Sequence, residues 1–155
     1  MTLEAKVLTV SDSVQAGTRQ DRSGPALGSY LSDHGFDVIA LETVPDGTGP
    51  VSTALRHLSD RFCGLLVTTG GTGFSPTDLT PEGTLAVVER QAPGLAEAVR
   101  TASPLGRLSR GVAGTLGACL IVNLPGSTAG ALESIGSVID VLPHALEILA
   151  GGHPH

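Results

Sequence analysis

Short apolar runs alternate along the chain with segments in which apolar residues recur at helical spacing. The apolar runs of strand length cover residues 6–10, 36–44, 65–69 and 118–123. The helical spacing predicts helices over residues 24–34, 51–62, 80–88, 93–102 and 129–149, the last of them broken near Pro143. Such alternation is typical of βαβ units, so the sequence predicts an α/β fold with a mostly parallel sheet covered on both faces.

The helix boundaries carry signals of their own. Gly35 follows the first helical segment in the place of a C′ glycine, and Gly64 closes the second. Thr80 is predicted to cap the third helix, because its side chain can accept from the free N–H groups of the first turn. Pro81 suits the first helical position, and Glu82 favours the positive end of the helix dipole.

Polar residues follow each of the four predicted strands. These polar segments cover residues 11–12, 45–46, 70–78 and 123–127. In an open parallel sheet, ligands bind beyond the carboxyl ends of the strands. We therefore expect the four segments to converge on one rim of the sheet and to form one ligand site.

Length and composition indicate one folded domain. It is predicted to span residues 1–155, with residues 151–155 as a tail. Hydrophobic residues make up 41% and charged residues 15% of the chain, which is typical of a globular protein. No apolar run approaches the roughly 20 residues that span a bilayer, and the first residues lack a signal-peptide pattern. We therefore expect a cytoplasmic protein without a membrane partner, in which Cys63 and Cys119 are both buried thiols.

The charge balance limits what the chain can bind. Fifteen acidic residues stand against nine basic ones, the net charge is −6, and no basic block could release counterions from DNA or RNA. Nucleic acid is therefore not an expected partner. A phosphate group would have to be bound locally, through backbone N–H groups or a metal ion.

The sharpest motif is Thr-Thr-Gly-Gly-Thr-Gly at residues 68–73, which is followed by Asp78. Glycines let backbone N–H groups turn toward an anion with no Cβ in the way. Three glycines in four residues, beside three threonines, favour this interpretation over a simple chain turn. The motif is neither a P-loop nor a Rossmann fingerprint, because it lacks Gly-Lys-[Ser/Thr] and Gly-x-Gly-x-x-Gly.

Three further motifs carry weaker signals. Residues 120–127 bring Asn123, a Pro-Gly turn and Ser127 to the rim. Asp46 follows Val44-Pro45 and, taken alone, is better explained as the cap of a turn. Residues 109–111 place Arg110 where it could meet a phosphate, and a plain surface turn explains this segment equally well.

At these motifs the sequence resembles the MogA/MoaB-like family, the molybdopterin-binding proteins of molybdenum-cofactor biosynthesis. The resemblance runs from residue 7 to residue 149 and rests on V-S-D-S at 10–13, T-T-G-G-T-G with D-x-T-P-E at 68–82, S-R-G-x-x-G at 109–114 and N-L-P-G-S at 123–127. It implies a three-layer α/β sandwich, a homotrimer and molybdopterin binding. The chain departs from the family at Gly47, where a second acid often follows Pro-Asp, and at Thr128, where the family has proline.

In the MogA-like branch, the resemblance further implies adenylyl transfer from ATP to molybdopterin, which gives adenylylated molybdopterin and pyrophosphate. Asp46 and Asp78 match the two aspartates implicated in that branch, and they would be both the catalytic residues and the ligands of Mg²⁺. A downstream molybdenum-insertion protein is an expected partner. The residues expected to contact molybdopterin or ATP are Ser11, Asp12, Ser13, Thr69, Gly70, Gly71, Thr72, Gly73, Ser109, Arg110, Asn123, Pro125, Gly126 and Ser127.

Three functions stay open at this point: an adenylyltransferase, a pterin-binding protein without catalysis, and an oligomeric scaffold. Asp46 and Asp78 favour the first over the second, although Gly47 weakens the comparison. The intact glycine motif argues against the scaffold, which would have no use for it.

Overall fold

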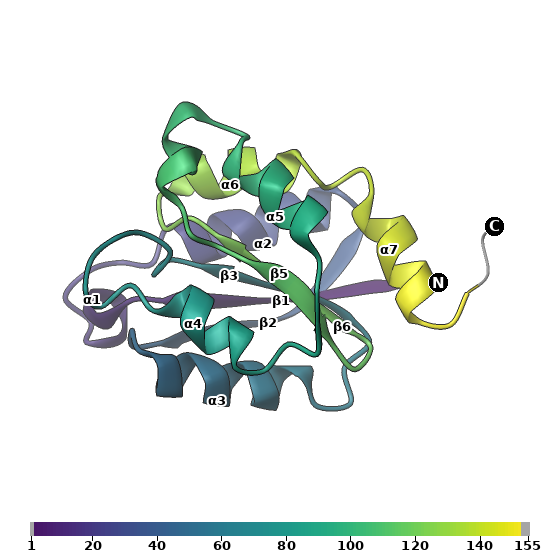
Figure 1. Ribbon diagram of the computed structural model, residues 1–155, viewed down its shortest axis with the longest axis horizontal. Helices are drawn as coiled ribbons and strands as arrows, with labels where there is room; N and C mark the ends of the chain where they lie inside the picture. Colours follow the sequence, from purple (N-terminus) through teal and green to yellow (C-terminus); the bar gives the residue numbers. More distant parts are fainter. Residues whose placement is uncertain (1, 153–155) are drawn as a thin grey trace.

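The computed structural model describes residues 2–152 and shows a sheet between two layers of helices (Figure 1). Within these residues the sheet has six strands in the order β2-β1-β3-β6-β5-β4. The strands are β1 (Leu3–Val10), β2 (Phe36–Val44), β3 (Gly64–Thr69), β4 (Arg90–Gln91), β5 (Ala113–Leu116) and β6 (Cys119–Leu124). The predicted three-layer α/β sandwich is therefore confirmed. Of the predicted tail, residues 153–155 lie outside the described part of the chain.

The helices alternate with the strands. They are α1 (Asp12–Gln15), α2 (Ser23–Asp33), α3 (Thr48–Ser59), α4 (Thr80–Leu85), α5 (Pro93–Arg100), the 3₁₀ helix η1 (Pro104–Leu108), α6 (Thr128–Gly136) and α7 (Leu142–Leu149). In Figure 1, α3 and α4 lie on one face of the sheet, whereas α2, α5 and α6 lie on the other. The sequence pattern did not predict α1, η1, β4 or β5, because each is short or lies at the edge of the sheet.

Two apolar cores fill the interfaces between the sheet and the two layers of helices. One contains Val7 and Val67 from the sheet and Leu27 from α2, all fully or almost fully buried. The other contains Leu8 from the sheet and Leu55 from α3. Because successive residues of a strand face opposite sides, a sheet buried on both faces needs the continuous apolar runs that the sequence shows.

Four neighbouring strands of the sheet run in the same direction. β1 pairs in parallel with both β2 and β3, and β3 pairs in parallel with β6. β5 and β4 continue the sheet in antiparallel pairing. The carboxyl ends of β1, β2, β3 and β6 therefore meet at one edge, beside α1 (Figure 1).

Three helix predictions need correction. The second helix ends at Ser59, so Gly64 does not close it but begins β3. The third helix ends at Leu85, because the chain must turn into β4, where the N–H of Glu89 already donates to the carbonyl of Thr115. The final segment is two helices, with α6 ending at Gly136 and α7 beginning at Leu142. The predicted break near Pro143 is confirmed, since this proline lies in the first turn of α7, where its missing N–H costs nothing.

The two cysteines differ in their surroundings. Cys119 is buried as predicted, and burial raises the pKa of its thiol to about 12. The prediction that Cys63 is buried was wrong, because this residue is exposed. It lies in the connection between α3 and β3, where the neighbouring Phe62 takes the core position instead. Within residues 2–152, no helix combines the length and apolar character needed to cross a bilayer.

Candidate functional site

The four polar segments meet at the carboxyl edge of the sheet, as the sequence predicted. They surround a hollow of about 540 Å³, which we call the acidic hollow. Its walls come from the ends of β1, β2, β3 and β6. The lining residues are Val10, Ser11, Asp12, Ser13, Arg19, Asp46, Gly70, Gly71, Thr77, Asp78, Gly126 and Ser127.

Asp12 and Asp46 tie the ends of β1 and β2 together. The N–H of Asp12 donates to Oδ2 of Asp46 at 2.9 Å, and the N–H of Asp46 donates to Oδ1 of Asp12 at 2.9 Å. Partial burial raises the pKa of Asp46, and the nearby Asp12 and Asp78 charges raise it further, against the lowering effect of the backbone hydrogen bond. The acidic hollow therefore holds crowded negative charge.

The glycine motif allows a close approach of three backbones. Gly70 and Gly71 have positive φ angles of 103° and 68°, which L side chains rarely adopt. A Cβ on Gly70 would run into the carbonyl oxygen of Val10. On Gly126 a Cβ would lie 3.2 Å from the Cα of Gly70, so the turn after β6 also packs against this loop. These glycines are needed for the shape of the rim itself.

Thr80 fastens the glycine loop to the start of α4. Its hydroxyl donates to the carbonyl of Gly70 at 2.9 Å, and its N–H donates to the carbonyl of Gly71 at 3.0 Å. The prediction that Thr80 caps α4 was wrong, because its fully buried hydroxyl bonds the loop and Leu79 stands at the N-cap. A Cβ on Gly71 would collide with this hydroxyl.

Asp78 stands between the glycine loop and α4. Its Oδ2 accepts from the N–H of Ser75 at 3.0 Å, which closes a turn before the helix. A Cβ on Gly73 would lie 2.9 Å from the same oxygen, so the missing side chain leaves room for the carboxylate. Asp78 and Asp46 line the same acidic hollow, although 32 positions separate them in the sequence.

Arg110 holds this loop from outside the acidic hollow. Its guanidinium donates to the carbonyl of Gly73 at 2.8 Å, to the carbonyl of Asp78 at 2.6 Å and to Oε2 of Glu82 at 2.7 Å. The hydrogen bond from Arg110 lowers the pKa of Glu82. The guanidinium is therefore engaged by the protein, which favours a positioning role over direct contact with a phosphate.

Two predicted contact residues have their side chains in the interior. Asn123 is 1% exposed, and its amide donates to the hydroxyls of Thr68 and Thr84 while its Oδ1 accepts from the N–H of Val112. The hydroxyl of Thr69 is also buried and donates to the carbonyl of Pro125 at 2.8 Å. Both side chains shape the rim from behind and do not line the acidic hollow.

A second hollow of about 750 Å³ adjoins the acidic one. We call it the leucine hollow, because Leu105 and Leu108 of η1 line it while remaining 77% and 55% exposed. The predicted contact residues on its walls are Gly71, Thr72, Gly73, Ser109, Pro125, Gly126 and Ser127. Asp78 lines both hollows, so a ligand could reach from the apolar wall to the carboxylates.

A third hollow of about 440 Å³ lies on the other side of Ser127. We call it the arginine hollow, since Arg19 and Arg22 line it together with Gln20, Ser23, Gly126, Ser127 and Thr128. Gly126 and Ser127 border all three hollows. Sequence reasoning missed the two arginines and Leu105, because nothing in the local pattern indicates that these segments fold back to the rim.

The carboxylates suit a shared metal ion better than a permanent one. Among the residues that the structure describes, no group of three or more His, Cys, Asp or Glu side chains could hold a metal. Asp46 and Asp78 nevertheless line one hollow together with Asp12, so three carboxyl groups lie around the same space. Two carboxylates fit Mg²⁺, which usually takes its other ligands from substrate phosphates and water.

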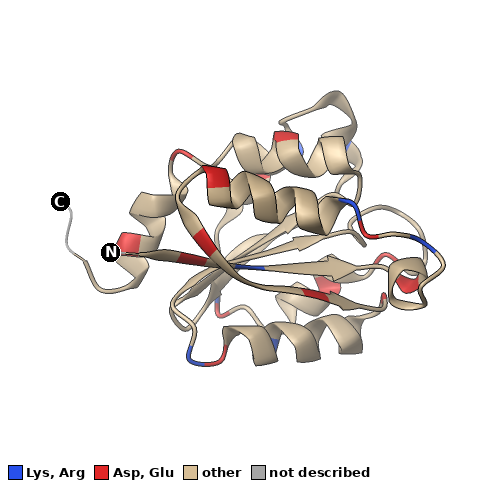
Figure 2. Ribbon diagram, turned by 180° about the vertical axis from the view of Figure 1, so that it is seen from behind, with Lys and Arg blue, Asp and Glu red and all other residues tan. Residues whose placement is uncertain are grey.

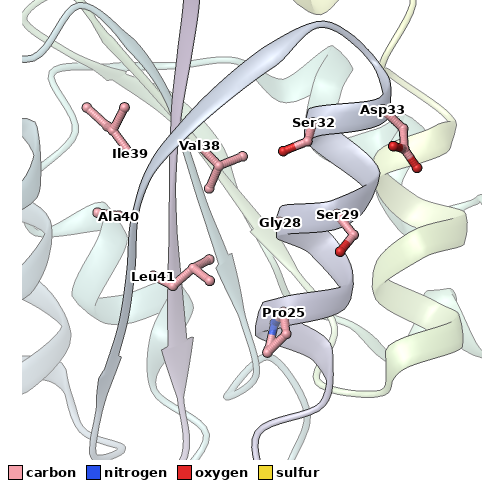
Figure 3. A pocket seen from close by; sticks show the side chains of 9 residues that line it. All are labelled: Pro25, Gly28, Ser29, Ser32, Asp33, Val38, Ile39, Ala40 and Leu41. Atoms are coloured by element: carbon pink, nitrogen blue, oxygen red, sulfur yellow. The ribbon is translucent and has the colours of Figure 1, made fainter.

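A further groove lies away from these loops, between α2 and the edge strand β2 (Figure 3). Its walls include Val38 and Leu41 from β2 and Gly28 and Asp33 from α2. Within residues 2–152, Asp33 is its only ionisable lining residue, and no basic side chain lines it. The groove therefore lacks the chemistry to hold an anion.

The fold and the rim together define a class. The chain is an α/β sandwich with a ligand site beyond the carboxyl ends of parallel strands, formed by glycine-rich backbone and two carboxylates. Comparison with known proteins then identifies the family. The family model described as "Probable molybdopterin binding domain" matches residues 6–144, and the chain belongs to this family.

Individual relatives agree over almost the whole chain. A curated protein of Helicobacter pylori named molybdopterin adenylyltransferase is 33% identical over 98% of this chain and 90% of its own length. The crystal structure of the molybdopterin biosynthesis enzyme MoaB from Thermus thermophilus matches with a TM-score of 0.91 and 45% identity, over 96% of this chain and 97% of the other. The molybdopterin biosynthesis Mog protein from Mycobacterium ulcerans matches with a TM-score of 0.87 and 40% identity, over 95% and 99% of the two chains.

Proposed function

We propose that this protein acts in molybdenum-cofactor biosynthesis and transfers an adenylyl group from ATP to molybdopterin. The observation that carries the proposal is that Asp46 and Asp78 line one hollow together with the glycine loop. Curated relatives named molybdopterin adenylyltransferase, among them that of Helicobacter pylori, support the same reaction.

The reaction needs no nucleophile from the protein. An oxygen of the terminal phosphate of molybdopterin attacks the α-phosphorus of ATP and forms a new P–O bond. The bond from the α-phosphorus to the bridging oxygen breaks, and pyrophosphate leaves with the electron pair. The protein's contribution is therefore to position the two phosphates and to neutralise their charge.

Named residues can supply both contributions. Asp46 and Asp78 would hold Mg²⁺, directly or through water, together with phosphate oxygens. Bound there, the ion would neutralise negative charge on the reacting phosphates. The backbone of residues 70–73 would cradle a phosphate, while Thr80 and Arg110 hold that loop in place. The hydroxyls of Ser11 and Ser13, and that of Ser127, border the same space.

The leucine hollow suits the ring of one substrate. Leu105 and Leu108 present apolar surface to water beside the glycine loop, and a flat heterocycle would cover it. Adenine and the pterin are both such rings. Whichever of the two does not occupy the leucine hollow would have to lie on another side of the acidic hollow.

Pterin binding without catalysis is the alternative function. Gly47 favours it, because the family often carries a second acid there, and the chain thus has fewer carboxylates for a metal. Gly47 stands at the N-cap of α3 with a φ of 126°, a conformation in which an acidic side chain would be strained. The retention of both Asp46 and Asp78 favours the enzyme.

Assembly and location form part of the proposal. The resemblance to the MogA/MoaB-like family supports a homotrimer, and sedimentation equilibrium showing a monomer at micromolar concentration would contradict it. The same resemblance supports a cytoplasmic protein that hands its product to a molybdenum-insertion protein. The two free thiols suit a reducing compartment.

The decisive experiment mixes the purified protein with ATP, Mg²⁺ and molybdopterin. Adenylylated molybdopterin and pyrophosphate are the expected products, detected by chromatography and by a pyrophosphate assay. Omission of Mg²⁺ is the first control and Asp78→Asn the second. Tight molybdopterin binding with no product under any of these conditions would establish the pterin-binding alternative.

A further inference from the structure

The arginine hollow contains positive charge that the fold does not use. Arg19 and Arg22 lie on the segment that joins α1 to α2, and in Figure 2 this segment carries basic positions at the same end of the molecule as the rim. Within residues 2–152, neither guanidinium makes a hydrogen bond or an ion pair. By contrast, Arg110 and Arg100 both donate to backbone carbonyls near the site.

This free charge borders the carboxylates. Arg19 lines both the arginine hollow and the acidic hollow, so the two spaces adjoin at this residue. Ser127 and Thr128 form another part of its wall at the start of α6. The Ser127 side chain accepts from the N–H of Gly130, and the N–H groups of the first helical residues have no acceptor within the helix itself. The wall therefore adds polar donors to a space that is already basic.

The leucine hollow has the opposite character. Among the described residues, its charged lining residues are Asp78 and Glu133, and no basic side chain lines it. A group with several negative charges would be repelled there. If the α-phosphate of ATP lies beside Asp46 and Asp78, the remaining phosphates therefore extend more favourably toward Arg19 and Arg22 than into the leucine hollow.

We propose that the arginine hollow binds the pyrophosphoryl group of the nucleotide, with Arg19 and Arg22 as its ligands. This inference rests on the proposed adenylyl transfer. As the bond to the α-phosphorus breaks, negative charge develops on the departing pyrophosphate. Guanidinium groups bind such oxygens through charge-assisted hydrogen bonds. Arg19 and Arg22 thus stabilise the leaving group and hold it away from the attacking phosphate.

The test measures binding of inorganic pyrophosphate and of AMP by calorimetry, at constant Mg²⁺ and low salt. We expect Arg19→Gln and Arg22→Gln each to weaken pyrophosphate binding by about tenfold, the loss of one charge-assisted contact. AMP, which lacks the pyrophosphoryl group, should bind within about twofold of wild type.

Arg90→Gln is the matched control. Arg90 lies on the edge strand β4, is exposed and lines none of the three hollows. Each substitution makes the net charge more negative by one, so a difference between the variants reports the local site and not the overall field. Arg19 and Arg22 make no side-chain contact that the fold needs, and circular dichroism melts should show all three variants folded.

The result can be separated from the proposed function, because pyrophosphate binding is measured without turnover. Unchanged pyrophosphate affinity in both Arg19→Gln and Arg22→Gln would overturn the inference even if the wild type makes adenylylated molybdopterin. An equal loss of AMP binding would also overturn it, because the arginines would then contact the α-phosphate. If pyrophosphate binding is unchanged and only molybdopterin binding weakens, the hollow belongs to the pterin's phosphate and the inference is wrong.

Discussion

Replacing Asn123 by leucine tests whether this residue builds the rim or contacts the ligand. The side chain is 1% exposed on β6 and joins three elements. Its amide donates to Thr68 of β3 at 3.0 Å and to Thr84 of α4 at 2.9 Å, and its Oδ1 accepts from the N–H of Val112 at 3.1 Å. Leucine has a similar size and can make none of these bonds. We therefore expect α4 to lose part of its attachment to the sheet.

The size of the loss in unfolding free energy depends on which hydrogen bonds the former partners of Asn123 still make. A buried polar group left without a partner costs about 1–3 kcal/mol. Thr84 still donates to the carbonyl of Thr80, and Val112 is only half-buried, so we expect both to lose less than the full amount. Thr68 is 0% exposed, so its hydroxyl is expected to bear the full cost of the lost hydrogen bond. The sum predicts a loss of about 2–4 kcal/mol, a large part of the roughly 5–15 kcal/mol that stabilises a typical domain.

Urea denaturation of wild type and Asn123→Leu measures this loss. Thr68→Val is the matched single variant, because it removes one partner at nearly constant volume and should cost about 1–2 kcal/mol. Once Asn123 is leucine, the Thr68 substitution should cost less than about 0.5 kcal/mol, because its partner has already gone. A destabilisation by Asn123→Leu below about 1 kcal/mol, with ligand binding abolished, would refute the reasoning and make Asn123 a ligand contact.

Three further substitutions test the rim. Asp78→Asn should keep the fold and lower turnover by about 10²-fold or more, and a rate within threefold of wild type, at saturating ATP, would exclude a catalytic role. Gly71→Ala should lower the melting temperature and ATP affinity together, because φ is +68° and a Cβ would meet Thr80, whereas Gly49→Ala, in open space on α3, should lower neither. Asp46→Asn should melt higher than wild type at pH 7. The pKa of Asp46 is raised in the folded state above the free value of 3.8, so folding favours the protonated carboxyl and loses stability as pH rises through the folded pKa. The difference in melting temperature between Asp46→Asn and wild type should therefore vanish toward pH 3, where the carboxyl is protonated in both the folded and the unfolded state.

The sequence predicted the sheet and the rim because both follow from local pattern and a general rule of α/β folds. The apolar run of β2 was predicted at the bounds that the structure shows, 36–44. The convergence of Asp46, Asp78 and the glycine loop followed from the rule that ligands bind beyond the carboxyl ends of parallel strands. Both predictions needed only residue types and their order along the chain.

Other features depend on contacts that residue type does not encode. The mutual hydrogen bonds of Asp12 and Asp46 require β1 and β2 to end together, with Val10 beside Val44. The sequence does not specify that register. Thr80 was predicted as a cap from its position, whereas the carbonyl of Gly70, brought near by the folded loop, takes its hydroxyl. Cys63 was judged by its apolar neighbours, although the connection between α3 and β3 turns it outward.

The distribution of charge around the rim explains why a protein with a net charge of −6 can bind highly negative substrates. Three aspartates, Asp12, Asp46 and Asp78, line the acidic hollow. Partial burial raises the pKa of Asp46, and repulsion from the charges of Asp12 and Asp78 raises it further. Mg²⁺ arriving with ATP would relieve that repulsion, so the metal and nucleotide should bind more tightly together than either does alone. Asp46→Ala should then raise the Mg²⁺ concentration that gives half-maximal turnover and leave molybdopterin affinity nearly unchanged. Calorimetry that finds tight Mg²⁺ binding without nucleotide would contradict this coupling, because it would mean that the protein alone forms the metal site.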